Sequence, residues 1–375
     1  MITASIFIFT TYAALVIAFI IGFKNVKLRT SNFEQPLHKF SIIIPFRNEA
    51  NNLNNLLQSI QKLNYPNKMF EVLLVNDASE DTSCTIIESF QKNHSHISIQ
   101  IIQNKRTSNS SKKDAIQTAV QQSKFNWIVA TDADCEVPKN WLQSFNKFIL
   151  EKQPVFISAA VKFKAEQSFL FHIQNLNFTS LIGSTIGAFG IQQPFLCNGA
   201  NMCYKKEVFQ KLNGFEGNKT IASGDDVFLL EKMVKNYATD VYFLKSKENI
   251  VITKCEMQWQ SFLNQQIRWA SKSSAYKNWF SILVGGIVFI TNLYILIIGF
   301  SLFLKPSNYP FFIAILLQKM FFDILLIEKT ASFLNTKQSL KHFPFVSLIY
   351  PFFTVIIALL SVIKEYEWKG RTFDK

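Results

Sequence analysis

The chain has 375 residues, of which 49% are hydrophobic and 14% aromatic, and this apolar content excludes a disordered protein. Lysine and arginine outnumber aspartate and glutamate by 39 to 26, a formal net charge of +13. Such a charge suits an anionic substrate, a membrane surface or nucleic acid. No basic-aromatic stripe or nucleic-acid-binding motif accompanies it, and we therefore expect no nucleic-acid partner.

The N-terminal segment predicts a membrane anchor. Residues 1–23 carry no charged side chain, and their apolar stretch is long enough to cross the hydrocarbon core of a bilayer. Lys24, Lys27 and Arg29 follow this stretch, whereas a cleaved signal peptide has its positive charge before the apolar run. By the positive-inside tendency, the chain that follows faces the cytoplasm, and a cell-membrane protein is expected.

The C-terminal part predicts a membrane domain over residues 278–363, with about three spans, followed by a basic tail over 364–375. Residues 278–304 and 343–363 are uncharged, whereas 311–327 contains Lys319 and Asp323, which are costly in lipid unless they are paired or face other helices. Four spans in all would place the tail opposite the domain that precedes them, against the positive-inside tendency. Either the middle segment lies at the membrane interface or the number of crossings differs.

Residues 31–277 form a long hydrophilic insert whose first half alternates strand and helix patterns. Apolar β-branched runs alternate with stretches that repeat apolar residues every three or four positions. The strand-like runs are 40–45, 70–76, 97–102 and 126–131, and the helical stretches are 49–63, 85–91 and 114–122. This order predicts an α/β domain with a mostly parallel sheet flanked by helices, inserted between the N-terminal transmembrane helix and the C-terminal ones.

Acidic residues follow two of the predicted strands. Asp77 follows one strand, and Asp132 and Asp134 follow another. In such sheets ligands bind beyond the carboxyl ends of the strands, so these residues are expected to converge. Asp132 and Asp134 are two positions apart and can point to the same side, as hard oxygen ligands of Mg²⁺ or Mn²⁺, which bridge diphosphate oxygens. A solvated turn is the alternative explanation for this pair taken alone.

Five segments, in this order, carry a resemblance to a known family: SIIIPFRNEANNLNNLLQSI, EVLLVNDASEDTS, ATDADCEVPKNWL, GDDVFLL and QQIRW. Together they resemble the membrane-bound family 2 glycosyltransferases with a GT-A fold, which is Rossmann-like. That group includes cellulose, hyaluronan and poly-N-acetylglucosamine synthases and ceramide glucosyltransferase. The resemblance covers roughly residues 40–275, and the flanking spans also fit the pattern.

The resemblance implies a role for each matching residue. Asp226 would be the general base, and Asp134 with Asp132 would hold the metal. The donor site would comprise Pro45, Glu49, Asp77, Lys112 and Asp132. The acceptor and diphosphate side would comprise Asp225, Gln265, Arg268 and Trp269. Two positions depart from the family pattern, because Ser111 replaces a common glycine before Lys112, and Asp225 stands where glutamate is common.

Structural explanations compete with these roles. Asp225 and Asp226 are also expected at a helix N-terminus, where acidic side chains are favourable. Gln265, Arg268 and Trp269 fall on one helical face and could form an interfacial surface with an aromatic anchor. Lys112 could belong to a solvated basic turn. Residues 169–195 are too polar to span but apolar enough to lie along a membrane, and we expect them to help form the acceptor entrance, with His172 packed or at the surface.

The expected function is that of a metal-dependent, inverting glycosyltransferase that moves a sugar from a nucleotide-diphosphate donor, a UDP-sugar, to a membrane lipid. A carboxylate takes the proton of the acceptor hydroxyl, while metal and cations stabilise the departing diphosphate. A processive polysaccharide synthase with a glycan acceptor is the alternative within the family. From another class, a non-catalytic membrane scaffold or a transporter is opposed by the intact motifs and by the absence of an internal sequence repeat.

Overall fold

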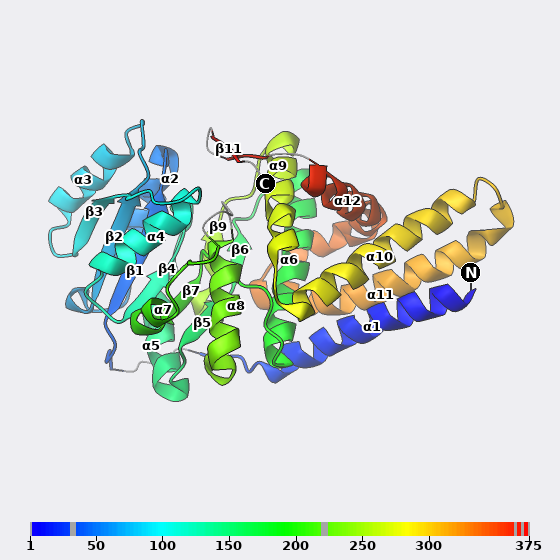
Figure 1. Cartoon of the computed structure of the whole chain (residues 1–375), viewed down its shortest axis with the longest axis horizontal. Helices are drawn as coiled ribbons and strands as arrows, with labels where there is room; N and C mark the ends of the chain where they lie inside the picture. The colour runs from blue at the N-terminus through cyan, green and yellow to red at the C-terminus, as the bar shows by residue number, and fades with distance from the viewer. Residues whose placement is uncertain (1, 31–34, 219–223, 364–365, 369–370, 374–375) are drawn as a thin grey trace.

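The structure, a computed structural model, describes residues 2–30, 35–218, 224–363, 366–368 and 371–373. An α/β domain lies at one end of the molecule, and a bundle of long helices extends from it (Figure 1). Parts of the predicted hydrophilic insert (31–34 and 219–223) and of the predicted tail (364–365, 369–370 and 374–375) lie outside the described residues.

A seven-stranded sheet forms the centre of the domain, in the order β3-β2-β1-β4-β7-β5-β8. The pairs β1–β2, β2–β3, β1–β4 and β5–β8 are parallel, and β7 is antiparallel to β4 and β5. The strands are β1 (Phe40–Phe46), β2 (Phe70–Asn76), β3 (Ile99–Gln103), β4 (Trp127–Ala130), β5 (Phe156–Ala159), β7 (Met202–Lys205) and β8 (Val241–Leu244). The mostly parallel α/β sheet predicted from the sequence is therefore confirmed.

Helices cover both faces of this sheet, which explains why its strands are continuous apolar runs. Leu53 and Leu57 of α2 pack with Ile42 of β1 in one core cluster, whereas Ile116 of α4 and Ile43 of β1 belong to another. The predicted apolar repeat of α2 is buried against the sheet. The domain helices are α2 (Ala50–Gln61), α3 (Ser83–Asn93), α4 (Ser111–Gln122), α5 (Trp141–Lys152), α7 (Lys206–Lys211) and α8 (Asp225–Tyr237).

Two further helices, α6 (Phe169–Gly190) and α9 (Trp259–Ser271), lie between the sheet and the bundle (Figure 1). They accompany a small parallel pair of strands, β6 (Val161–Phe163) and β9 (Val251–Thr253). Helix α6 packs very closely against the first helix of the chain. A Cβ added at Gly187 would lie only 2.5 Å from the carbonyl oxygen of Phe19. Glycine therefore permits this contact. His172 of α6 is buried and stacks on His342, so it is a packed residue.

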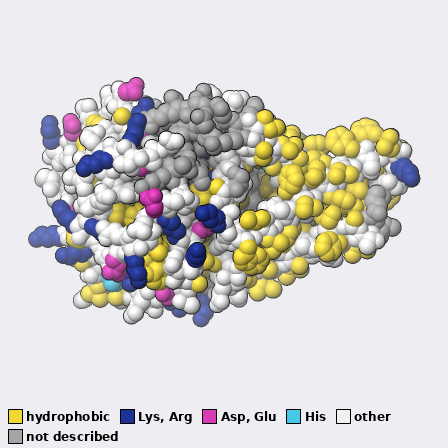
Figure 2. All heavy atoms as spheres, viewed as in Figure 1, with side chains coloured by type: hydrophobic (Ala, Val, Ile, Leu, Met, Phe, Trp, Pro, Cys, Tyr) yellow, Lys and Arg dark blue, Asp and Glu magenta, His cyan; other side chains and the backbone are white. Residues whose placement is uncertain are grey.

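Four helices are long and apolar enough to cross a membrane: α1 (Ile2–Asn25), α10 (Trp279–Ser301), α11 (Tyr309–Leu334) and α12 (Phe343–Ile363). Four such helices are consistent with an integral membrane protein, and hydrophobic side chains predominate on the face of the bundle that Figure 2 shows. In Figure 1, α1, α10 and α11 run lengthwise side by side, whereas α12 is seen nearly along its axis. A hairpin of β10 (Tyr366–Trp368) and β11 (Arg371–Phe373) follows α12.

The two charged residues of the segment 311–327, Lys319 and Asp323 of α11, face each other inside the bundle. Lys319 Nζ lies 2.5 Å from Asp323 Oδ2, and the Tyr12 hydroxyl of α1 donates to Asp323 Oδ1 at 2.6 Å. Lys319 also lies over the ring of Tyr350 of α12, with its Nζ 5.1 Å from the ring centroid. The pairing that the sequence required for these charges is therefore present.

Candidate active site

One cavity of about 1310 Å³ opens beyond the carboxyl ends of β1, β2 and β4. The side chains that line it come from the α/β domain, from α6 and α9, and from the membrane helices α10 and α12. All eleven residues that the sequence assigned to the site line this cavity: Pro45, Glu49, Asp77, Lys112, Asp132, Asp134, Asp225, Asp226, Gln265, Arg268 and Trp269. The structure thus brings together motifs that lie far apart in the chain.

Lys112, in the first turn of α4, links two of these acidic motifs. Its Nζ lies 2.7 Å from Asp132 Oδ1 and 3.3 Å from Asp225 Oδ2. Burial acts to lower the pKa of Lys112, but the two carboxylates outweigh it and raise that pKa above its ordinary value. The next residue, Lys113, turns away, donates to the carbonyl oxygen of Asn218 at 2.8 Å and is not among the residues that line the cavity. Lys112 therefore lines the cavity and is paired with two carboxylates, unlike a lysine in a solvated turn.

Asp226 lies at the start of α8, where it meets both backbone donors and a cation. Its Oδ1 accepts the N–H of Val227 at 2.8 Å, and its Oδ2 accepts the N–H of Gly199 at 3.3 Å. Lys272 Nζ lies 3.4 Å from Oδ1. Burial alone would raise the pKa of Asp226, but Lys272, Lys112 and these N–H groups hold it below its ordinary value. Asp226 does not cap α8, whose N-cap is Gly224, but as an acidic residue in the first turn it is favourably placed there and also lines the cavity.

The pKa of Asp225 is shifted in the opposite direction to that of Asp226. Burial raises the pKa of Asp225 above its ordinary value, although Lys112 acts against this shift. Its Oδ2 is buried and makes no hydrogen bond within the described structure, although Lys112 is near. A Cβ added at Gly199 would lie only 3.1 Å from this oxygen, so glycine lets the backbone approach the acidic pair. The surroundings thus shift the pKa values of these two adjacent carboxylates in opposite directions.

The motif on α9 presents three side chains to the cavity. Gln265 Nε2 donates to Glu256 Oε1 at 3.2 Å, and the ring of Trp269 lies 6.2 Å from that of Phe178, measured between centroids. Burial raises the pKa of Glu256, and Arg268 opposes this shift. The sequence analysis missed Glu256, and the available signal was its place as the acidic residue nearest before the QQIRW motif. It also missed Lys272, which follows that motif.

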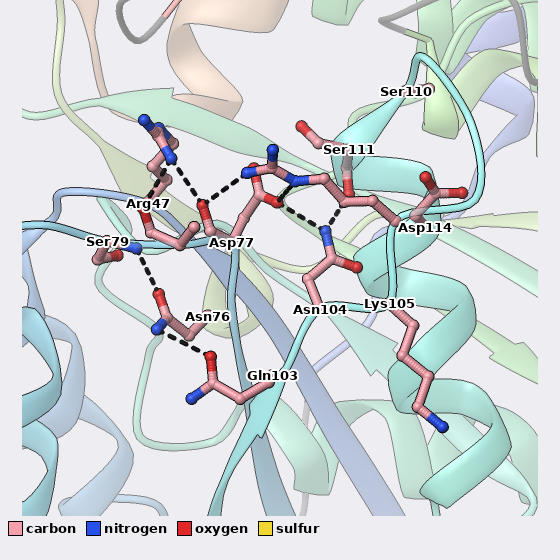
Figure 3. Close-up of polar contacts among 12 residues, drawn as sticks. Arg47, Asn76, Asp77, Ser79, Gln103, Asn104, Lys105, Ser110, Ser111 and Asp114 are labelled. Carbon is pink, nitrogen blue, oxygen red and sulfur yellow. Dashed lines mark hydrogen bonds and ion pairs between the residues drawn. The ribbon is translucent and has the colours of Figure 1, made fainter.

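Asp77 is surrounded by donors from neighbouring loops (Figure 3). Its Oδ1 accepts from Arg106 Nε at 2.7 Å and from Asn104 Nδ2 at 2.8 Å. Its carbonyl oxygen accepts from Arg47 Nη1 at 2.9 Å. Nearby, Glu49 binds Asn52 and its backbone N–H donates to Ser83. This network fixes the loops after β1 and β2 around one rim of the cavity, and the sequence analysis did not anticipate Arg106.

The carboxylates fit a divalent cation only in part. No group of three or more His, Cys, Asp or Glu side chains with metal-binding geometry exists among the described residues. Asp132 and Asp134 nevertheless both line the cavity, and Thr253 donates to Asp134 Oδ2 at 3.4 Å. Mg²⁺ is commonly held by one or two carboxylates together with substrate phosphates. Asp132 and Asp134 therefore fit a cation only if a bound phosphate group supplied its remaining ligands.

The cavity continues from the polar site into an uncharged crevice between α10 and α12. The residues that line this part include Ile282, Gly285, Gly286, Phe353 and Ile357. A Cβ added at either glycine would meet no atom within 4 Å, so space is open beside them. Acidic, cationic and apolar walls are thus parts of one continuous cavity.

Comparison with known proteins identifies the relatives of the chain. The model of the family described as glycosyl transferase family 21 matches residues 6–374. The poly-beta-1,6-N-acetyl-D-glucosamine synthase of Staphylococcus epidermidis is 24% identical over 163 residues, which are 42% of this chain and 37% of that protein. Glycosyltransferase AglE of Haloferax volcanii is 29% identical over 103 residues, 28% of this chain and 33% of that protein. The matches thus span about a third of the length of these relatives.

A solved structure supports the fold. The mannosyltransferase PcManGT from Pyrobaculum calidifontis, in complex with GDP-Man and Mn²⁺, superposes with a TM-score of 0.59 at 15% identity, covering 97% of this chain and 99% of that one. The expected resemblance to GT-A glycosyltransferases is confirmed. The family that the sequence suggested was numbered 2, whereas the matching model is that of family 21.

Proposed function

Because the chain belongs to glycosyl transferase family 21, we propose that it is a metal-dependent, inverting glycosyltransferase that moves a sugar from a UDP-sugar to a membrane lipid. The observation that carries this proposal is the single cavity that joins the carboxylates to the uncharged crevice between α10 and α12. A hydrophilic donor and the apolar part of an acceptor could occupy its two halves together. The basic residues after α1 favour a domain that faces the cytoplasm at the cell membrane.

The residues at the centre of the cavity suit a one-step displacement. The acceptor hydroxyl oxygen attacks the anomeric carbon, the bond from that carbon to the diphosphate oxygen breaks, and Asp226 takes the hydroxyl proton. The low pKa of Asp226 keeps it ionised and able to accept a proton at neutral pH. Arg268 offers a planar fork of donors to phosphate oxygens, and Trp269 offers a flat face to a sugar.

Asp134 and Asp132 are the residues that would hold Mg²⁺ or Mn²⁺. When bound there, the ion would neutralise charge on the departing diphosphate. In this structure Asp132 already pairs with Lys112, so Lys112 is placed to contribute positive charge to the same group. The Mn²⁺ in the complex of the solved mannosyltransferase is consistent with this assignment.

The nucleotide would occupy the rim formed by Pro45, Glu49 and Asp77. The ordered carboxylate of Asp77, fixed by Arg106 and Asn104, is suited to accept hydrogen bonds from a base. The solved relative holds GDP-Man, so competition between UDP and GDP for this chain is a direct test of the expected uridine donor.

A processive polysaccharide synthase remains the alternative, since one relative is named as such an enzyme. A growing polymer needs a path across the membrane. Within the described residues, no side chain of α1 or α11 lines the cavity, so its apolar part lies between α10 and α12 and does not pass through the bundle. This arrangement favours a single transfer to a lipid.

The test uses membranes containing wild-type protein or Asp226→Asn, with a panel of labelled nucleotide sugars and Mg²⁺ or Mn²⁺. After the reaction, the label is partitioned between organic and aqueous phases. Label that enters the organic phase only with wild type supports lipid glycosylation and identifies the donor. Label in large aqueous polymer would favour the synthase, and equal transfer by both proteins would exclude Asp226 as the base.

A further inference from the structure

Both ends of α12 lie next to helices of the glycosyltransferase domain. At its start, Phe343 and Val346 share a core cluster with Leu170 of α6, and the ring of Phe345 lies 5.4 Å from that of Phe169, measured between centroids. After its end, β10 lies against α9. The residues at the start of α12 and those directly after its end therefore lie on the same side of the bundle, next to the domain.

The length of α12 makes this return informative. A helix of 21 residues is about 31 Å long, enough to cross the hydrocarbon core. If α12 crossed the membrane, the residues directly after it would lie on the far side, about 30 Å from the helices at its start. The contact between β10 and α9 is incompatible with that position.

At the end of the bundle farthest from the α/β domain, called the distant end, the described part of α12 contributes nothing to the apolar core. There, Phe9 of α1, Ile295 and Ile298 of α10 and Ile315 of α11 form a separate apolar cluster, and the described residues of α12 take no part in it. In the middle of the bundle, α12 touches α11 through Tyr350 and Lys319. Together with its end-on appearance in Figure 1, this places α12 across the domain-side half of the bundle.

We propose that α12 lies in the plane of the membrane within the leaflet next to the domain, that only α1, α10 and α11 cross the membrane, and that the C-terminal tail is on the same side as the domain. One face of α12 packs on the protein, with Phe353 stacked on Phe262 of α9 at 5.3 Å. The other face is apolar and about half exposed: Phe345, Leu348, Phe352, Ile356 and Leu359. Lipid acyl chains cover this face, because it continues the apolar surface of the bundle.

The charge distribution agrees with three crossings. The tail carries four basic residues, Lys364, Lys369, Arg371 and Lys375, whereas the loop between α10 and α11 contains only Lys305. With α12 in the plane of the membrane, all four lie on the same side as Lys24, as the positive-inside tendency requires. This removes the conflict in the sequence analysis, and the helix that does not cross is the last one, whereas the sequence analysis had suspected the middle segment.

Protease protection tests this topology without reference to enzymatic activity. One variant carries an epitope tag at the C-terminus, and a matched variant carries the same tag after Lys305, in the loop at the distant end. Sealed vesicles are prepared with the domain outward, as shown by digestion of the domain itself. We expect protease to remove the C-terminal tag and to spare the tag after Lys305. Protection of both tags would overturn the proposal, because α12 would then cross.

A depth measurement on α12 gives an independent answer. Phe345→Cys and Val362→Cys lie near the two ends of the helix and are exposed. Each is labelled with a nitroxide, in a background in which the partly exposed Cys84 and Cys197 are changed to serine. Equal accessibility of both labels to a paramagnetic reagent added on the domain side is expected. A label at position 362 that responds only to reagent on the opposite side would contradict the in-plane helix.

Discussion

Lys272 Nζ lies 3.4 Å from Asp226 Oδ1, which joins the residue directly after α9 to the first turn of α8. This ion pair is one reason why the pKa of Asp226 is below its ordinary value despite burial. The proposed base is therefore kept ionised by a residue from another part of the site. The contact connects the charge state of the base with the position of the α9 motif.

We predict that Lys272→Gln moves the acid limb of the pH profile to higher pH. A cation favours the charged carboxylate, so its loss raises the pKa of Asp226, and the base becomes protonated at a higher pH than in wild type. The value of kcat/KM is measured against pH for wild type, Lys272→Gln and Lys272→Arg. The arginine variant retains the charge and should keep the acid limb near its wild-type position. A rate loss with an unchanged profile would show that Lys272 acts only on substrate.

The sequence predicted the alternation of strands and helices because each element has its own apolar period. The eleven residues singled out by the ordered motifs all line one cavity, because these motifs follow particular strands and helices, whereas Glu256 and Lys272 lie outside the motifs and were missed. Contacts such as Lys272 with Asp226 and Arg106 with Asp77 escaped prediction, since they join residues whose separation in the chain carries no periodic signal. The orientation of α12 also escaped prediction, because an in-plane helix packed on protein is as apolar as a spanning one.

Filling the crevice between α10 and α12 should reduce transfer to the acceptor more than it reduces binding of the donor. Gly286 lines the crevice beside open space, so Gly286→Phe places a ring where an apolar chain would lie. We expect transfer to lipid to fall at least about tenfold, in line with the cost of misplacing a reactant, while hydrolysis of the nucleotide sugar by water persists. Ile290→Phe is the control, because Ile290 is on the same helix, is exposed and does not line the cavity. Equal loss of hydrolysis and transfer would argue against an acceptor in the crevice.

Removing one carboxylate from the proposed metal pair should weaken cation binding. Asp134→Asn keeps an oxygen that can accept from Thr253 but loses the negative charge. We expect the Mn²⁺ concentration for half-maximal activity to rise about tenfold to a hundredfold, and bound Mn²⁺ measured by electron paramagnetic resonance with a nucleoside diphosphate to decrease. Asp81→Asn is the matched control, since Asp81 binds Ala50 and Ser83 and does not line the cavity. Unchanged Mn²⁺ binding by the Asp134 variant would remove this residue from the metal site.

The ion pair inside the bundle should matter most when only one partner is removed. Lys319 is 2% exposed, and Lys319→Met leaves the Asp323 carboxylate in an apolar bundle with the Tyr12 hydroxyl. Breaking a buried pair costs about 3–5 kcal/mol, so a clear drop in the thermal midpoint in detergent is expected. In Lys319→Met/Asp323→Asn no charge remains and the asparagine oxygen can still accept from Tyr12, so most of the loss should be recovered. The exposed pair of Lys337 and Glu328, at 3.2 Å, provides the control, because Lys337→Met should change stability by less than about 1 kcal/mol. A double variant as unstable as the single one would mean that Lys319 contributes by packing between the rings of Tyr12 and Tyr350 and not by its charge.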